Sequence, residues 1–160
     1  AGRIIIPSFD ESGDLNYFIA RNYMENDSYK YKNPKYSKDI IFNDLNIDWN
    51  RDIILCEGVF DAINCDNAIP ILGSSLNEES VLFQKICMHK PNVFLGLDQD
   101  VKHKEFYIMK KLRDYGIKTH SLSLAPFSDL GEMPREEIKN RKSSAAFITD
   151  MDYLKYRLDF

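Results

Sequence analysis

The sequence is poor in cysteine and histidine, the residues that hold disulfide frameworks and structural zinc. Its three cysteines, Cys56, Cys65 and Cys87, are odd in number and include no C-x-x-C pair, which argues against both kinds of framework. The three histidines, His89, His103 and His120, do not have the spacing of a zinc site. Cys56 and Cys87 lie among apolar residues and are interpreted as small buried hydrophobic side chains.

Long hydrophobic runs are also absent. No stretch approaches the roughly 18 apolar residues that a membrane-spanning helix requires. The start, Ala-Gly-Arg followed by three isoleucines, is too short for a secretory signal. We therefore expect a cytoplasmic protein without a membrane partner, made of one domain or of one domain with a small appendage.

The net charge of −4 gives the whole molecule no general attraction for nucleic acid. One segment differs, because cations alternate with tyrosines between residues 21 and 38. The cations are Arg21, Lys30, Lys32, Lys35 and Lys38, and the tyrosines are Tyr23, Tyr29, Tyr31 and Tyr36. Such a segment can hold a nucleic-acid strand, and a solvated tyrosine-rich loop is an equally good interpretation.

The first 50 residues and the remainder have different patterns. Residues 3–23 are expected to form a β-hairpin whose first strand ends at Pro7, residues 24–38 a loop, and residues 40–47 a short helix. From residue 52 onward, buried strands alternate with helices. The expected strands are 53–56, 69–72, 93–97 and 117–124, and the expected helices are 59–65, 77–89 (capped by Asn77), 101–115 and 134–142, with moderate helical character over 143–160. The alternation predicts a mainly parallel sheet with helices on both faces.

Three acidic residues follow predicted strands. Glu57 comes directly after the first core strand, and Asp98 and Asp100 come after the third. If these strands are neighbours, the three side chains converge at one sheet edge, where α/β proteins bind ligands. Asp61, four residues after Glu57, is expected on the same helix face. Clustered carboxylates suit Mg²⁺ and a phosphate-bearing ligand, although for any one of these acids taken alone an ordinary loop residue is the better interpretation.

The motifs at these positions resemble a known family. Residues 57–61, 73–76 and 98–100 read E-G-V-F-D, G-S-S-L and D-Q-D, which is similar to the Toprim domain of primases, topoisomerases and some nucleases. Upstream, Ile6-Pro7, Asp10, Gly13, Phe18 and Arg21 match without a gap the segment F-P-I-x-D-x-x-G-x-x-x-G-F-G-G-R of bacterial- and phage-type (DnaG-like) DNA primases. Lys30-Tyr31 with Asn33-Pro34, and Ser128 to Glu132, resemble the later primase segments K-Y-x-N-S-P and K-D-P-D-E.

The resemblance implies an α/β fold, with a Toprim-type mainly parallel sheet flanked by helices and a small N-terminal hairpin and basic subdomain. It divides the chain into a basic segment (1–50) resembling part of the primase catalytic core, a Toprim metal-binding domain (51–127), and an acidic loop with a helical extension (128–160).

The implied function is that of the catalytic portion of a DNA primase, a nucleotidyltransferase that makes RNA primers for DNA replication from ribonucleoside triphosphates on single-stranded DNA. The implied cofactor is Mg²⁺, for which Mn²⁺ can substitute. The implied catalytic residues are Glu57, Asp98 and Asp100, which together with Asp61 and Asp129 hold metal. The implied nucleotide and nucleic-acid contacts are Arg21, Lys30, Lys32, Lys38 and Lys102.

The sequence also departs from the family. The primase pattern D-G-D-x-A-G becomes Asp98-Gln99-Asp100-Val101-Lys102-His103, and for Lys102 and Lys104 an ordinary surface role is a slightly better interpretation than phosphate contact. The zinc module and further core residues that precede this region in primases are not in the sequence. We therefore expect a fragment or one part of a split enzyme, in a bacterial cell or phage-infected host, with a zinc-bearing amino-terminal part and a replicative helicase as partners. The alternatives are a Toprim nuclease and a non-catalytic, nucleic-acid-binding Toprim module.

Overall fold

The structure is a computed structural model that describes residues 2–24, 30–73, 76–98 and 102–158. Its elements, in chain order, are β1 (Arg3–Phe9), β2 (Leu15–Asn22), the 3₁₀ turn η1 (Asp44–Asn46), β3 (Ile53–Cys56), α1 (Val59–Asn64), β4 (Ala68–Pro70), α2 (Val81–His89), β5 (Val93–Gly96), α3 (Lys102–Asp114), β6 (Thr119–Ser121), α4 (Arg135–Ser144) and α5 (Asp150–Leu158). None of the described helices is long and apolar enough to cross a bilayer.

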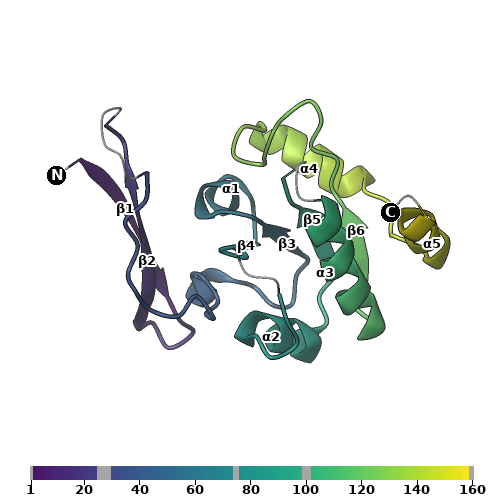
Figure 1. Cartoon of the computed structure of the whole chain (residues 1–160), viewed down its shortest axis with the longest axis horizontal. Helices are drawn as coiled ribbons and strands as arrows, with labels where there is room; N and C mark the ends of the chain where they lie inside the picture. The colour runs from purple at the N-terminus through teal and green to yellow at the C-terminus, as the bar shows by residue number, and fades with distance from the viewer. Residues whose placement is uncertain (1, 25–29, 74–75, 99–101, 159–160) are drawn as a thin grey trace.

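Two sheets organise the chain, as Figure 1 shows. Strands β1 and β2 form an antiparallel hairpin, and the other four strands form a parallel sheet in the order β4-β3-β5-β6. The first and third core strands, β3 and β5, are direct neighbours, with Cys56 opposite Gly96. The predicted fold class, a mainly parallel α/β sheet with a separate hairpin, is confirmed.

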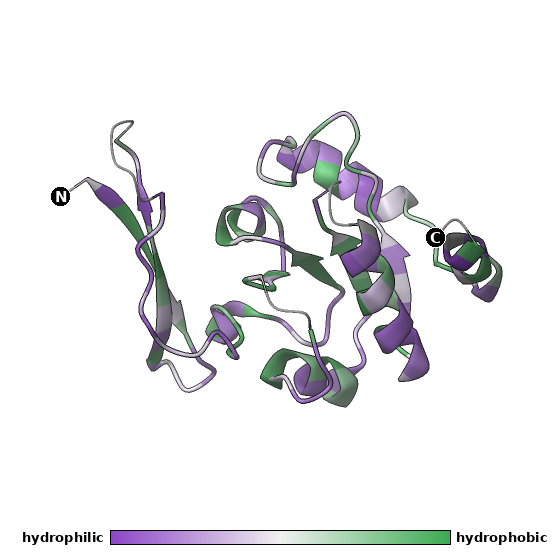
Figure 2. Cartoon of the chain, viewed as in Figure 1, coloured by the Kyte–Doolittle hydropathy of each residue, from purple (hydrophilic) through white to green (hydrophobic). Residues whose placement is uncertain are grey.

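Alternate residues of β3 enter opposite hydrophobic cores, as the two-residue period of a strand requires. Ile53 and Leu55 pack in a core covered by α2, α3 and α5. Ile54 and Cys56 pack on the other face, together with α1 and α4. A strand covered on both faces is apolar throughout, and Figure 2 shows β3 as hydrophobic, in contrast to the mainly hydrophilic α4.

A third hydrophobic cluster attaches the hairpin to α1. Tyr17 and Ile19 of β2 pack with Phe42 and Val59. The sequence pattern predicted that the first strand ends at Pro7. In the structure β1 continues to Phe9, with Pro7 opposite Phe18. Proline is tolerated there because β1 lies at the edge of its sheet, where one side of the strand needs no ladder hydrogen bond.

The prediction of a helix over residues 40–47 is wrong, because the segment forms only the short 3₁₀ turn η1. Asn43 has a left-handed backbone with φ of 56°, which interrupts right-handed helical geometry. Ile41 and Phe42 are nevertheless buried, the first in the α2–α3 core and the second in the hairpin cluster. The two apolar side chains therefore occur in sequence because this segment connects two hydrophobic cores, and not because they share one face of a helix.

Two other predicted boundaries differ from the structure. The helix expected from Asn77 begins at Val81, because Ser80 caps it by accepting a hydrogen bond from the Phe83 N–H at 3.3 Å. The strand expected over 117–124 has ladder pairing only at β6, while Leu122 and Leu124 are buried beyond it. These two buried leucines continue the apolar sequence pattern past the end of the strand, which is why the predicted strand was too long.

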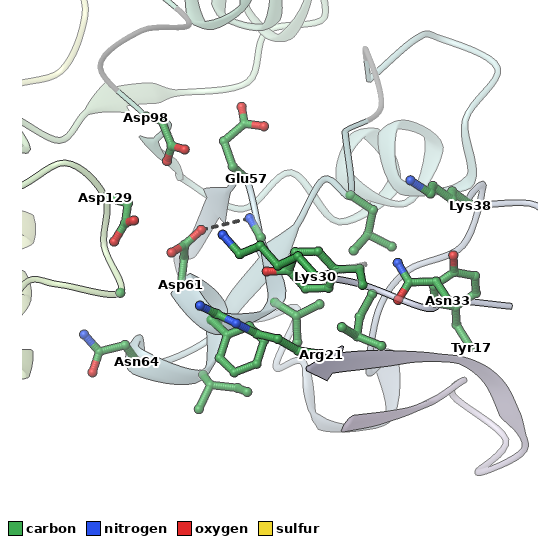
Figure 3. A pocket seen from close by; sticks show the side chains of 18 of the residues that line it. Tyr17, Arg21, Lys30, Asn33, Lys38, Glu57, Asp61, Asn64, Asp98 and Asp129 are labelled. Carbon is green, nitrogen blue, oxygen red and sulfur yellow. Dashed lines mark hydrogen bonds between the residues drawn. The ribbon is translucent and has the colours of Figure 1, made fainter. Parts of the chain in front are cut away.

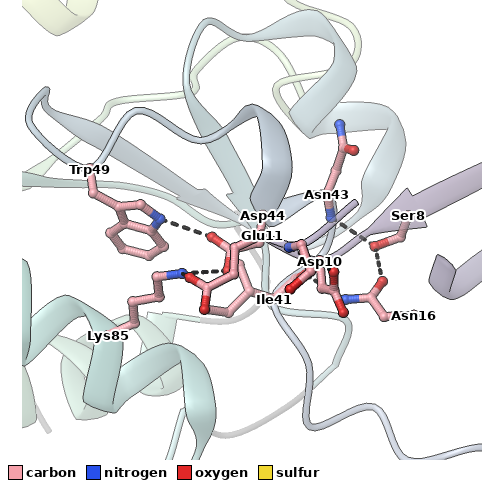
Figure 4. Close-up of polar contacts among 10 residues, drawn as sticks. Ser8, Asp10, Glu11, Asn16, Ile41, Asn43, Asp44, Trp49 and Lys85 are labelled. Atoms are coloured by element: carbon pink, nitrogen blue, oxygen red, sulfur yellow. Dashed lines mark hydrogen bonds and ion pairs between the residues drawn. The ribbon is translucent and has the colours of Figure 1, made fainter. Parts of the chain in front are cut away.

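An ionic junction joins the hairpin tip to the sheet (Figure 4). The Lys85 ammonium on α2 lies 2.6 Å from a carboxylate oxygen of Glu11 and 2.6 Å from one of Asp44. The Trp49 indole N–H donates to the other Asp44 oxygen at 2.9 Å. Asp44 is buried and Glu11 is exposed. The junction therefore fixes the hairpin, η1 and α2 relative to one another.

Candidate functional site

A cavity of about 730 Å³ lies between the hairpin and the carboxyl end of the parallel sheet (Figure 3). One wall comes from β2 and the segment after it, and the opposite wall comes from the ends of β3 and β5, helix α1 and the loop before α4. The charged and amide side chains that line it are Arg21, Lys30, Asn33, Lys38, Glu57, Asp61, Asn64, Asp98, Asp129 and Glu132. The cations line the hairpin wall, and the acids line the opposite wall.

The acidic wall follows from the parallel pairing of β3 and β5. Glu57 is the first residue after β3, and Asp98 is the second after β5. Both line the same cavity, so the structure brings together two of the three acids that the sequence placed at strand ends. The third, Asp100, lies outside the described residues.

Asp61 is held at the first turn of α1. Its Oδ2 accepts the Gly58 N–H at 2.9 Å, and the side chain is buried. Burial raises the pKa of this carboxyl; the Gly58 hydrogen bond opposes the shift, and the negative charge of nearby Asp129 adds to it. Glu57 precedes the helix, so the prediction that Glu57 and Asp61 share a helix face is wrong.

The loop before α4 brings Asp129 beside Asp61. The Asn64 amide donates to the carbonyls of Leu130 at 2.8 Å and of Met133 at 2.6 Å, which ties the loop to the end of α1. A Cβ at Gly131 would lie 3.0 Å from an Asp61 oxygen and 3.1 Å from an Asp129 oxygen. Glycine thus gives the two carboxylates room at this position.

Glu57 forms an ion pair that the sequence did not predict. The Lys104 ammonium on α3 lies 3.0 Å from Glu57 Oε2, and the two side chains are only 24% and 19% exposed. The other oxygen, Oε1, is buried and accepts no hydrogen bond from the described part of the chain. The slightly favoured interpretation of Lys104 as an ordinary surface lysine is therefore wrong.

The hairpin wall presents its cations with aromatic support. The Arg21 guanidinium lies 4.4 Å from the centre of the Phe60 ring and 5.9 Å from that of Tyr31, within the range of cation–π attraction. Lys30 and Lys38 also line the cavity. These contacts restrict the guanidinium without neutralising it, which leaves its charge for an anionic ligand.

The other two predicted cations are placed differently. Lys32 is exposed and is not among the residues lining the cavity; its backbone N–H donates to the Ala20 carbonyl at 2.9 Å. Lys102 begins α3, and its side chain lies outside the described residues. The prediction that these two residues contact nucleic acid stays untested.

The thiols close to the site are unsuited to nucleophilic chemistry. Burial raises the pKa of Cys56 far above its usual value and that of Cys65 to about 12. The thiolate is the reactive form, so both groups stay protonated at neutral pH. The cavity therefore offers carboxylates and cations for chemistry.

The donor set fits Mg²⁺ in chemistry, although no preformed cage exists among the described residues. No three histidine, cysteine, aspartate or glutamate side chains in the described ranges, which omit Asp100, converge on a single point. Mg²⁺ normally keeps several waters and binds through one or two carboxylates together with substrate phosphates. Glu57 Oε1 is buried without a hydrogen-bond donor from the described residues, so a cation there would offset the cost of its burial.

Sequence reasoning missed Lys104, Phe60 and Asn64 as parts of this site. Lys104 contacts a residue 47 positions earlier and Asn64 contacts a residue 66 positions later, and no local pattern reports contacts at such separations. For Phe60 a signal existed, because an aromatic residue inside the E-G-x-x-D motif falls on the first turn of α1.

Comparison with solved structures identifies the architecture. A DNA primase domain from Pseudomonas aeruginosa superimposes with a TM-score of 0.73 at 19% identity, covering 98% of this chain and 56% of the primase. A DnaG primase catalytic domain bound to single-stranded DNA gives 0.72 at 21% identity, covering 98% and 55%. The Aquifex aeolicus primase, with zinc-binding and RNA polymerase domains, gives 0.71 at 23% identity, covering 91% and 40%.

The chain has the fold of a DnaG-type primase catalytic core. It spans about half the length of the primase structures it matches. No protein-family model and no curated protein sequence matches it. The resemblance seen in the E-G-x-x-D and D-x-D motifs is therefore confirmed at the level of fold.

Proposed function

We propose that this chain is the catalytic portion of a DNA primase, which joins ribonucleotides into an RNA primer on a single-stranded DNA template. The observation that carries the proposal is that carboxylates and cations line opposite walls of the same cavity. The carboxylates are Glu57, Asp61, Asp98 and Asp129, and the cations are Arg21, Lys30 and Lys38. Its volume of about 730 Å³ is within the range of small-molecule sites and suits a nucleoside triphosphate.

Each wall has a distinct task in this reaction. Glu57, Asp98 and Asp100 hold Mg²⁺, with Asp61 and Asp129 supporting it; Mn²⁺ can replace it. When bound there, the metal would supply positive charge to the phosphates, and these carboxylates would hold it at the carboxyl end of the sheet. Arg21 suits two-point contact with a phosphate, whereas Lys30, Lys38 and, outside the cavity, Lys32 and Lys102 act as point charges toward triphosphate or template.

Asp61 also has an organising task. By accepting the Gly58 N–H it fixes the backbone between Glu57 and α1, and this limits the positions available to the Glu57 carboxylate. Preorganised charge is effective because it needs no rearrangement during the reaction. The neighbouring Gly131 keeps Asp129 within reach of the same space.

A primase of this kind acts with other parts. A zinc-bearing amino-terminal part is the first expected partner, because the similar Aquifex aeolicus structure contains zinc-binding and RNA polymerase domains. A replicative helicase is the second, from the sequence resemblance alone. A nucleic-acid partner is supported by the similar DnaG domain bound to single-stranded DNA. This role would place the protein inside a bacterial or phage-infected cell, as expected from the sequence.

The test is template-directed incorporation of ribonucleotides by this chain, alone and joined to a primase zinc module and amino-terminal core. Glu57→Gln keeps the size of the side chain and removes its charge, so we expect loss of metal-dependent synthesis with an unchanged circular dichroism spectrum. Glu78→Gln, at an exposed position outside the cavity, is the matched control and should retain synthesis. Equal synthesis by Glu57→Gln and the unmutated protein would remove Glu57 from the mechanism.

A second candidate is a Toprim module that binds nucleic acid without catalysis. The ion pair between Lys104 and Glu57 and the lack of a preformed three-carboxylate group in the described ranges favour it. Strand binding without ribonucleotide incorporation under any metal condition would support this candidate. Metal-dependent cleavage of the template would instead indicate a Toprim nuclease.

A further inference from the structure

The ion pair at Glu57 places a cation of the protein itself at the proposed metal site. Lys104 Nζ contacts Glu57 Oε2 at 3.0 Å, and more than three quarters of each side chain is shielded from solvent. Glu57 lines the cavity, whereas Lys104 approaches from α3 and is not among the lining residues. The ammonium thus contacts the carboxylate from a side chain that does not itself line the cavity.

A divalent ion and this ammonium compete for one carboxylate. An ion bound to Glu57 would lie within a few ångströms of Lys104 Nζ, and repulsion between like charges is poorly screened where solvent is excluded. A carboxylate without any counter-ion is also unfavourable in a partly buried site. A cation at Glu57 is therefore favourable, and the two candidate cations repel each other there.

We propose that Lys104 is an exchangeable counter-ion: it neutralises Glu57 while the site lacks metal, and it is released to a nucleotide phosphate when metal binds. The proposal rests on the proposed function, because it assumes that Glu57 holds metal. Lysine suits such an exchange, since its ammonium is a compact charge on a flexible stem and needs no fixed orientation.

The exchange has a direct consequence for binding order. Metal alone must bind Glu57 against the repulsion of the Lys104 ammonium, whereas metal arriving with a triphosphate supplies the ammonium with a new anionic partner. Metal binding and nucleotide binding therefore support each other, and Lys104 is the residue that couples them. This role is one of positioning and charge exchange, separate from contact with the reacting atoms.

The experiment is a titration of Mn²⁺ into the protein without nucleotide, followed by electron paramagnetic resonance of free Mn²⁺. Lys104→Met retains the apolar stem and removes the charge, and we expect Mn²⁺ affinity to rise about five-fold, which corresponds to a weak partly shielded ion pair. In the presence of saturating Mn²⁺, the same variant should bind a fluorescent ATP analogue several-fold more weakly. A purely structural defect would lower both affinities.

Two controls separate the contact from general effects. Lys104→Arg keeps a cation at Glu57 and should leave Mn²⁺ affinity within about two-fold of the unmutated protein. Lys110→Met removes the same charge from an exposed position on α3, which measures the effect of net charge. Unchanged or weaker Mn²⁺ binding by Lys104→Met would overturn the exchange while leaving the proposed function intact. Failure of every protein to bind Mn²⁺ at millimolar concentration would overturn the proposed metal site and the exchange with it.

Discussion

Replacing Lys85 with methionine removes the centre of the junction between the hairpin and the sheet. The change leaves Asp44, whose side chain is only 8% exposed, with the Trp49 N–H as its remaining partner among the contacts of the junction. Removing one partner of a buried ion pair typically destabilises by about 3–5 kcal/mol. Lys85 is 16% exposed and methionine keeps part of its packing, so we expect a smaller loss of about 2–3 kcal/mol, just below that range.

The two anionic partners of Lys85 are expected to contribute unequally. Glu11 is 74% exposed, so Glu11→Gln should destabilise by less than about 1 kcal/mol. Asp44→Asn in the Lys85→Met background removes the stranded charge and keeps an acceptor for Trp49. The double variant should therefore recover to within about 1 kcal/mol of the unmutated protein.

Urea unfolding, followed by tryptophan fluorescence and by circular dichroism, measures these differences, because the single tryptophan belongs to the junction. For a chain of this length a loss of 2–3 kcal/mol lowers Tm by about 4–12 °C. Hydrogen exchange should show the added opening first in β1 and β2. A Lys85→Met protein as stable as the unmutated one, or a double variant less stable than Lys85→Met, would refute the assignment of the junction as the hairpin's anchor.

Three further predictions concern the cavity and the hydrophobic core beneath it. Asp61→Asn should stabilise the protein most at pH 7, because the raised pKa means that the folded state disfavours the ionised form; the gain should vanish as pH falls through the folded pKa toward 3.8, measured by unfolding at several pH values. Gly96→Ala would place a Cβ 2.5 Å from a Leu130 methyl group, so thermal unfolding should show a loss of about 1–3 kcal/mol. Lys30→Ala should weaken single-stranded DNA binding and reduce its log–log salt slope by about 0.7, measured by fluorescence anisotropy. A slope that does not change would exclude phosphate contact by Lys30.

The fold of the sheet was predictable because its signals are local. The apolar runs that became β3 and β5, and the short connections to α1 and α2, specify buried parallel strands without any long-range information. The acids Glu57 and Asp98 were predictable for the same reason, because the end of a buried strand is visible in the sequence. Their meeting in one cavity follows from the neighbouring positions of β3 and β5.

The errors came from residues whose role depends on distant partners. The segment around Asn43 has helical spacing, but Ile41 and Phe42 serve two different cores, and the backbone turns between them and η1. Lys104 resembles any lysine on an amphipathic helix until Glu57 is placed beside it. In both cases the deciding contact joins elements that the chain separates, and only the tertiary structure reveals it.

The attachment of the Asp129 loop to α1 through Asn64 has a consequence for dissecting this protein. A shortened chain ending at Pro126 would keep all four strands of the parallel sheet, yet it would expose the face that Leu130, Met133 and Ile138 now cover. It would also lack two of the carboxylates of the cavity, Asp129 and Glu132. A region chosen for expression or domain exchange should therefore extend to the end of α4. A boundary placed directly after the last strand of the sheet would remove part of the cavity wall.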